Sequence, residues 1–139
     1  MKYILAPFAG WLAAGGTKFL LAWIRRGRPQ IRDIVAYGGF PSIHTSVMST
    51  VTFLAGFTEG FDTPLFAVAM GTFLLLIIDA HGLRRQVGKH GEVLNRMQRE
   101  LPVSTSATLR ERMGHKWIEI AGGLVLGIVV GWIFSRVNF

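Results

Sequence analysis

Residues 3–24 read YILAPFAGWLAAGGTKFLLAWI, an apolar run interrupted only by Thr17 and Lys18. A helix needs about 20 consecutive apolar residues to cross the hydrocarbon core of a bilayer, and this run has that length. The whole chain agrees, because 50% of its 139 residues are hydrophobic and only 17% are charged, unlike an average soluble domain. We therefore predict that residues 3–24 form a membrane-spanning helix.

Three further apolar runs follow, at residues 43–57, 64–78 and 117–134. Ser42 is placed to cap the first of these helices, and Pro64 suits the first turn of the second. The sequence thus predicts an all-α integral membrane bundle of about four short transmembrane helices. At this length the chain is expected to be a single transmembrane helical domain, residues 1–139.

Residues 79–116 form a polar loop between the third and fourth predicted helices. Pro102 and the run Ser104-Thr105-Ser106 interrupt this segment. We expect amphipathic helical pieces here, lying at the membrane surface.

The last helix carries a stripe of small residues at four-residue spacing, Gly123, Gly127 and Gly131. Such a stripe lets another helix approach closely. The partner helix belongs either to the same bundle or to a second subunit, and the latter would make a homo-oligomer.

Basic residues are distributed unequally between the two sides of the predicted bundle. Twelve lysines and arginines fall in the loops after the first and third helices, whereas only Lys2 and Arg136 lie on the opposite side. Because basic loops stay in the cytoplasm, we expect a multi-pass protein of the inner (cytoplasmic) membrane, with both termini outside. This orientation accounts for the net charge of +7, and we expect no nucleic-acid partner.

The unusual polar residues gather at the cytoplasmic ends of the predicted helices. Ionisable groups inside a membrane are costly and usually functional. The chain has no cysteine, which excludes thiolate chemistry and leaves histidines, carboxylates and basic residues as candidates. These candidates are Lys18 in the first helix, His44 at the start of the second, Asp79 at the end of the third, and His115 with Glu119 at the start of the fourth.

These residue types, placed at helix starts, could bind and transfer a phosphoryl group. If the fourth helix begins by Gly114, His115 and Glu119 share a face, and the carboxylate can hold one imidazole nitrogen and leave the other as a nucleophile. Ser42 and His44 lie at a helix start, where anions bind. Four basic residues are candidates to clamp phosphate oxygens, namely Lys18, Arg28, Arg84 and Arg85.

Three blocks of the chain resemble the motifs of the divergent type-2 phosphatidic acid phosphatase family. Residues 38–46, GGFPSIHTS, resemble its G-G-M-P-S-S-H-S-A motif. Residues 79–88, DAHGLRRQVG, look like its D-A-x-G-x-R-R-x-x-G block, with Leu94-Asn95 beyond. Gly114-His115 with Glu119 resembles its G-H-x-x-x-E block. The resemblance covers nearly the whole chain.

The wider type-2 phosphatases and the related vanadium haloperoxidases use K-x6-R-P, P-S-G-H and S-R-x5-H-x3-D blocks. By this resemblance His115 would be the nucleophile, Glu119 the carboxylate that orients it, and His44 the general acid. The resemblance implies a lipid phosphate substrate and no cofactor.

The chain departs from the wider pattern at several positions. Lys18 stands ten residues before Arg28-Pro29 where the pattern has seven, Ile43 replaces a glycine, and Glu119 replaces an aspartate. No Ser-Arg pair precedes His115 at the expected distance. The missing arginine is then one of four candidates, Arg84, Arg85, Arg110 or Arg112.

Two other histidines and Asp79 lie in or next to the polar segment. His81 and His90 fall in the polar segment, and we expect them to be interfacial side chains outside the site. Asp79 can bind a substrate hydroxyl, neutralise Arg84 or Arg85, or help hold a metal, and pairing with an arginine is the preferred interpretation.

The leading hypothesis from sequence is a metal-independent membrane phosphatase that hydrolyses a lipid phosphate or diphosphate through a phosphohistidine intermediate. Two alternatives stay open. One is a non-catalytic membrane protein that binds anionic lipid head groups through the same basic residues. The other is a metal-dependent membrane hydrolase with histidine and carboxylate ligands.

Overall fold

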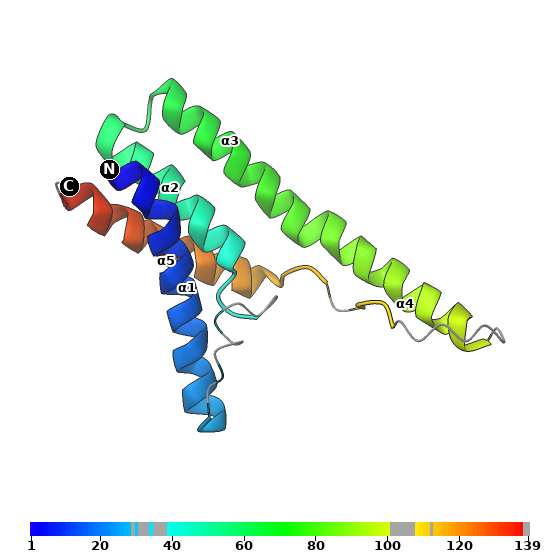
Figure 1. Ribbon diagram of the computed structural model, residues 1–139. Coiled ribbons are helices and arrows are strands. Elements are labelled where there is room, and N and C mark those ends of the chain that lie inside the picture. The colour runs from blue at the N-terminus through cyan, green and yellow to red at the C-terminus, as the bar shows by residue number, and fades with distance from the viewer. Residues whose placement is uncertain (29, 31–33, 35–38, 101–107, 112, 138–139) are drawn as a thin grey trace.

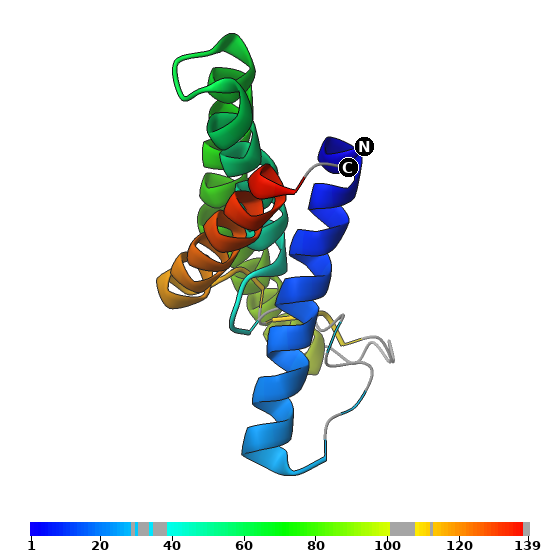
Figure 2. The same cartoon turned by 90° about the vertical axis from the view of Figure 1, so that its left-hand side faces the viewer.

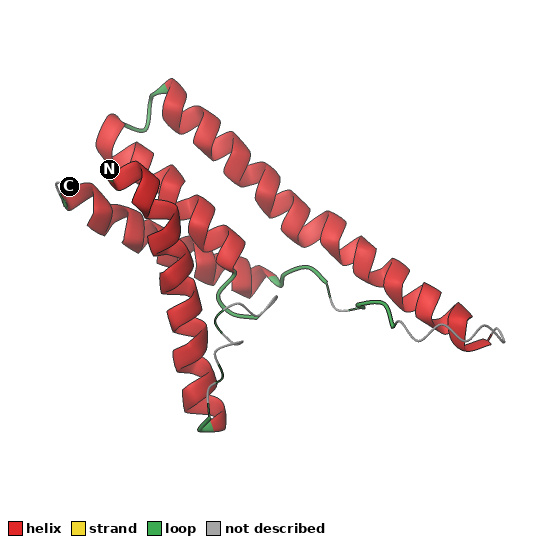
Figure 3. Cartoon of the chain, viewed as in Figure 1, coloured by secondary structure: helices red, strands yellow, loops and turns green. Residues whose placement is uncertain are grey.

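The computed structural model describes residues 1–28, 30, 34, 39–100, 108–111 and 113–137. Helices account for all the regular structure of this part of the chain, as Figure 3 shows. They are α1 (Lys2–Arg26), α2 (Ile43–Glu59), α3 (Pro64–Ile78), α4 (Arg84–Glu100) and α5 (Trp117–Arg136). The predicted all-α membrane bundle is thus confirmed. Pro102 and residues 104–106, predicted to interrupt the polar segment, lie outside the described residues.

Within the described residues, three helices are long and apolar enough to cross a membrane: α1, the combined helix Pro64–Glu100, and α5. The fourth predicted helix, α2, has 17 residues and lies inside the bundle against α1, α3 and α5. Its N-cap is Ser42, whose hydroxyl accepts a hydrogen bond from the Thr45 backbone N–H, as expected. The described helices therefore surround one short buried helix.

The third predicted helix, residues 64–78, is α3, but the chain stays helical beyond Ile78. One turn of π-helix, η2 (Asp79–Leu83), joins α3 to α4, so residues 64–100 form one continuous helix of 37 residues. The segment after α4 returns along it, where Asn95 bonds to the backbone of Leu109 through both its carbonyl and its amide. The expected polar loop is therefore helical as far as Glu100, because a π turn accommodates an extra residue without breaking the helix.

Buried hydroxyl groups line α2 where it packs against α5. Four of them, Thr45, Ser46, Ser49 and Thr50, are fully buried. Ser46, Ser49 and Thr50 donate to carbonyls one turn earlier in the helix. The hydroxyls are satisfied internally, so they can be buried without losing hydrogen bonds.

The glycine stripe of α5 faces these hydroxyls in the same chain. A Cβ atom at Gly123 would meet the Ser42 carbonyl at 2.6 Å, and one at Gly131 would meet the Thr50 carbonyl at 2.9 Å. At Gly127 a Cβ would collide with the Ser49 side chain. Of the two partners left open by the sequence, the structure therefore shows the internal one, since the stripe packs on α2.

The two termini lie side by side at one end of the bundle, in both Figure 1 and Figure 2. Near this end the Tyr3 hydroxyl bonds to Thr58 at the end of α2. The starts of α2 and α5 and the end of α3 lie away from the termini, as the charge pattern predicts (Figure 1). The fold thus gathers the motif-bearing helix ends together.

Replacing Gly127 by Ala should destabilise the bundle by about 1–3 kcal/mol, because the added methyl group overpacks the contact with Ser49. Gly71→Ala in α3 is the matched control, since a Cβ there meets nothing within 4 Å. Thermal unfolding in detergent should show a lower midpoint for Gly127→Ala alone. Equal midpoints for the two variants would contradict the packing described here.

Candidate functional site

Two main-chain hydrogen bonds join the three motif segments. The Ser42 N–H at the start of α2 donates to the Glu119 carbonyl in α5, at 2.9 Å. The His115 N–H donates to the Ala80 carbonyl in η2, at 3.0 Å. Gly114 makes the second contact possible, because its φ of 88° is a conformation that side chains disfavour. The three segments are therefore held together at backbone level.

The His115 ring is buried, with 8% of the residue exposed, and is held by Glu119. Its Nδ1 lies 2.9 Å from Glu119 Oε2, and the same oxygen accepts the Lys116 N–H at 3.2 Å. Since an ionised carboxylate only accepts hydrogen bonds, Nδ1 carries a proton, and in the neutral imidazole the lone pair is then on Nε2. This is the geometry expected for an oriented histidine nucleophile.

His115 and Glu119 contact each other as predicted, but not as two residues on one face of a helix. Helix α5 begins at Trp117, so His115 precedes the helix and is not part of its face. Glu119 lies in the first turn and folds back over the helix start, where it also accepts the Lys116 N–H. The capping interaction of a helix start therefore brings the carboxylate to the imidazole.

His44 and Lys18 approach His115 from α2 and α1. The His44 and His115 rings lie 5.9 Å apart between centroids, tilted by 59°. Lys18 is 7% exposed and interacts electrostatically with Glu119 and with His44. The structure thus brings both predicted histidines and the predicted lysine together.

Asp79 forms an ion pair with Arg84. The Arg84 Nε donates to Asp79 Oδ2 at 2.9 Å, and both side chains are 38% exposed. This is the preferred interpretation of Asp79 from the sequence, and it is confirmed. Both charges interact electrostatically with His44, so the ion pair lies near the pair of histidines His44 and His115.

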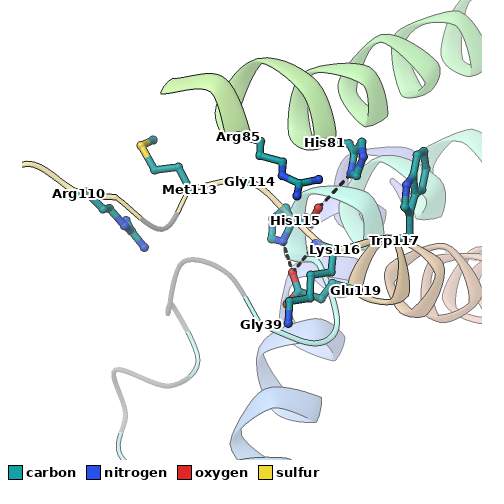
Figure 4. Close-up of a pocket in the computed structure, with 10 residues that line it drawn as sticks. All are labelled: Gly39, His81, Arg85, Arg110, Met113, Gly114, His115, Lys116, Trp117 and Glu119. Carbon is teal, nitrogen blue, oxygen red and sulfur yellow. Dashed lines mark hydrogen bonds and ion pairs between the residues drawn. The ribbon is translucent and has the colours of Figure 1, made fainter. Parts of the chain in front are cut away.

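A pocket of about 700 Å³ opens beside His115. Figure 4 shows Arg85 and His81 reaching toward His115 from one helix, with Glu119 on the other side of the ring. Among the lining residues, Arg85, Arg110 and Lys116 are cationic and Glu119 is the acidic residue. The walls therefore carry a formal charge of +2 and favour an anion.

His81 lines the pocket, although the sequence places it among the interfacial side chains. Its Nδ1 lies 3.3 Å from the His115 carbonyl, and its ring lies 4.3 Å from the Trp117 ring between centroids. Because a carbonyl only accepts, His81 Nδ1 carries the proton of this bond. Its position directly after the motif residues Asp79-Ala80 is the signal that sequence reasoning undervalued.

Among the predicted binding residues, Arg85 lines the pocket, whereas Lys18, Arg28, Ser42, Asp79 and Arg84 do not. Ser42 is fully buried, and its N–H and hydroxyl are used by Glu119 and Thr45, so it caps a helix and presents no group to the pocket. Arg28 follows the end of α1, is exposed, and is not part of the pocket wall. Gly38 of the first motif and the candidate Arg112 lie outside the described residues.

The described residues contain no group of three or more histidine, aspartate or glutamate side chains that could hold a metal ion. Glu119 is used by His115, and Asp79 is used by Arg84. These two carboxylates are therefore engaged with protein groups.

Comparison with known proteins agrees with the motifs. The chain matches the model of the divergent PAP2 family over residues 1–130. A relative in Bacillus subtilis (strain 168), the uncharacterized membrane protein YuiD, is 26% identical over 73% of this chain and 73% of its own length. No solved structure matches. Because the family model spans residues from α1 to α5, the chain is a helical membrane protein that belongs to the divergent PAP2 family.

Proposed function

We propose that this protein is a membrane phosphatase that hydrolyses a lipid phosphate or diphosphate through a phosphohistidine intermediate. One observation carries the proposal: buried His115 donates Nδ1–H to Glu119 at the wall of a cationic pocket. In the neutral imidazole, a proton on Nδ1 leaves on Nε2 the lone pair that a nucleophile requires. Family membership supports a phosphatase-related role.

The first step transfers the phosphoryl group to His115. The Nε2 lone pair forms a bond to phosphorus while the phosphorus–oxygen bond to the lipid breaks. The leaving oxygen takes a proton from protonated His44, the neighbouring imidazole. Arg85, Arg110 and Lys18 stabilise the charge on the phosphoryl oxygens, and Glu119 stabilises the cationic imidazole that forms.

The second step returns the histidine to its starting state. Neutral His44 takes a proton from a water molecule whose oxygen forms a bond to phosphorus. The phosphorus–nitrogen bond breaks and its electron pair returns to Nε2, which releases inorganic phosphate. His44 is protonated again, so the two steps balance and need no metal ion.

The proposed location is the inner membrane, with the site on the cytoplasmic side. The lysines and arginines at the end of α1, in α4 and in the segment before α5 support this orientation, since they follow the helix ends that lie away from the termini. The lipid head group would then reach His115 from the cytoplasmic leaflet.

Replacing His115 by Ala should abolish phosphate release, because it removes the proposed nucleophile. The measurement is phosphate release by purified protein from a panel of lipid phosphates and diphosphates, with EDTA present throughout. We expect a fall of at least about 100-fold for the variant, and wild-type activity that EDTA does not remove.

His90→Ala is the matched control, because His90 is exposed on α4 and should keep full activity. Turnover retained in His115→Ala would overturn the mechanism. A folded wild-type protein that binds the lipids and releases no phosphate would instead support the head-group-binding alternative, and activity lost with EDTA would support the metal-dependent one.

Glu119→Gln should lower kcat by roughly 100-fold, because the amide keeps the shape of the carboxylate but not its charge. The KM should change little, since Glu119 contacts His115 and the capping N–H. Steady-state kinetics separates the two parameters. An unchanged kcat would remove Glu119 from the mechanism.

The orientation can be tested by cysteine labelling, since the native chain has no cysteine. Glu59→Cys lies at the end of the bundle with the termini, and Arg99→Cys lies at the far end of α4. In intact cells a membrane-impermeant maleimide should label position 59 and spare position 99. The reverse pattern would place the site outside the cell.

A further inference from the structure

A second, apolar groove of about 470 Å³ lies between α1 and α5. Thr17 of α1, the pair Phe40-Pro41, and the face of α5 from Ile118 to Val129 form its walls. Val125 and Val129 on that face are exposed. In a membrane, this exposed face of α5 meets hydrocarbon.

The groove and the cationic pocket are lined by neighbouring residues of the same two segments. In the loop before α2, Gly39 lines the pocket and its neighbour Phe40 lines the groove. At the start of α5, Trp117 and Glu119 line the pocket, while Ile118 between them lines the groove. The polar pocket and the apolar groove are therefore neighbours, as a site for a molecule with a polar end and an apolar chain requires.

Phe40 packs directly on the backbone of α5 at Gly122. Any Cβ at that position would collide with the aromatic ring. Phe40 is 40% exposed. Gly122 thus makes room for Phe40, which forms the boundary between the polar pocket and the apolar groove.

We infer that the groove between α1 and α5 holds the hydrocarbon chain of the substrate whose phosphate occupies the cationic pocket. This inference rests on the proposed function. It adds the route by which the substrate enters the site: its hydrocarbon chain moves laterally from the bilayer along α5. Ile118 of the groove is next to Glu119 of the pocket. A substrate whose chain lies in the groove would therefore have its phosphate beside His115.

The groove contributes mainly by positioning the substrate. A chain that moves from the bilayer into the groove exchanges one apolar environment for another, so it gains little from the hydrophobic effect. A fixed chain does restrict the phosphate to one position, and small displacements of reacting atoms cost large factors in rate. Obstructing the groove should therefore lower turnover of long-chain substrates selectively.

The kinetic test compares hexadecyl phosphate with butyl phosphate, whose chain is too short to fill the groove. Val125→Trp fills the groove, and Ile133→Trp adds the same bulk at an exposed position of α5 that does not line it. For Val125→Trp, the ratio of kcat/KM for the long substrate over the short one should fall about ten- to a hundredfold. Ile133→Trp should leave the ratio unchanged, and an equal fall for both substrates in Val125→Trp would overturn the inference.

A binding test makes the inference independent of turnover. Hexadecyl phosphate with a diazirine at the chain end is photo-cross-linked to the wild-type protein and to His115→Ala, and the labelled peptides are identified by mass spectrometry. Label should appear on α5 between Ala121 and Val129, compete with unlabelled hexadecyl phosphate, and disappear in Val125→Trp.

The two tests separate the two proposals. If neither alkyl phosphate is hydrolysed but α5 is labelled competitively, the phosphatase proposal fails and the groove stands. If label spreads over the exposed face of α3 as strongly as over α5, the groove is not a chain site, even where hydrolysis is observed.

Discussion

The acceptor groups of Glu119 hold the candidate site together. Its carbonyl accepts the N–H of Ser42 and so ties α5 to the start of α2. Its carboxylate accepts from His115 and from the Lys116 N–H, and so fixes the imidazole while it caps α5. One residue therefore sets the distance between two helix starts and the tautomer of the candidate nucleophile. A shift of α5 relative to α2 would change both, so helix packing and site chemistry cannot vary independently.

The close approach of α2 and α5 follows from the residues between them. The glycines of α5 present backbone to the hydroxyl-bearing face of α2, and Ser49 donates to the Gly123 carbonyl across the contact. In a membrane, helices gain little from burying apolar surface against each other, because lipid is equally apolar. Close van der Waals contact and such hydrogen bonds are what remains to join them. The small residues thus provide the precision that the Ser42–Glu119 bond requires.

Much of this arrangement could be predicted from residue patterns, because those patterns are local. Apolar runs gave four helices whose starts agree with the structure to within one residue, and the Asp79–Arg84 pair needed only one helical turn between its partners. Predictions failed where the outcome depends on tertiary contacts or on an unusual turn. The π turn that joins α3 to α4 brings His81 against Trp117. The pattern of apolar residues in the sequence does not predict this turn. Ser42 looks available for an anion in sequence, and only the position of Glu119 shows that its N–H is occupied.

Charge balance explains why the cluster tolerates burial. A lysine as enclosed as Lys18 is costly in a membrane unless an opposite charge lies near, and Glu119 supplies that charge. The same carboxylate faces the cations of the pocket wall, so a single negative group serves several positive ones. An anionic ligand would share this role, since its oxygens would interact with the cations that otherwise face Glu119. The site is therefore built with more positive charge than its own carboxylate balances, which is the electrostatic condition for holding a phosphate at the membrane boundary.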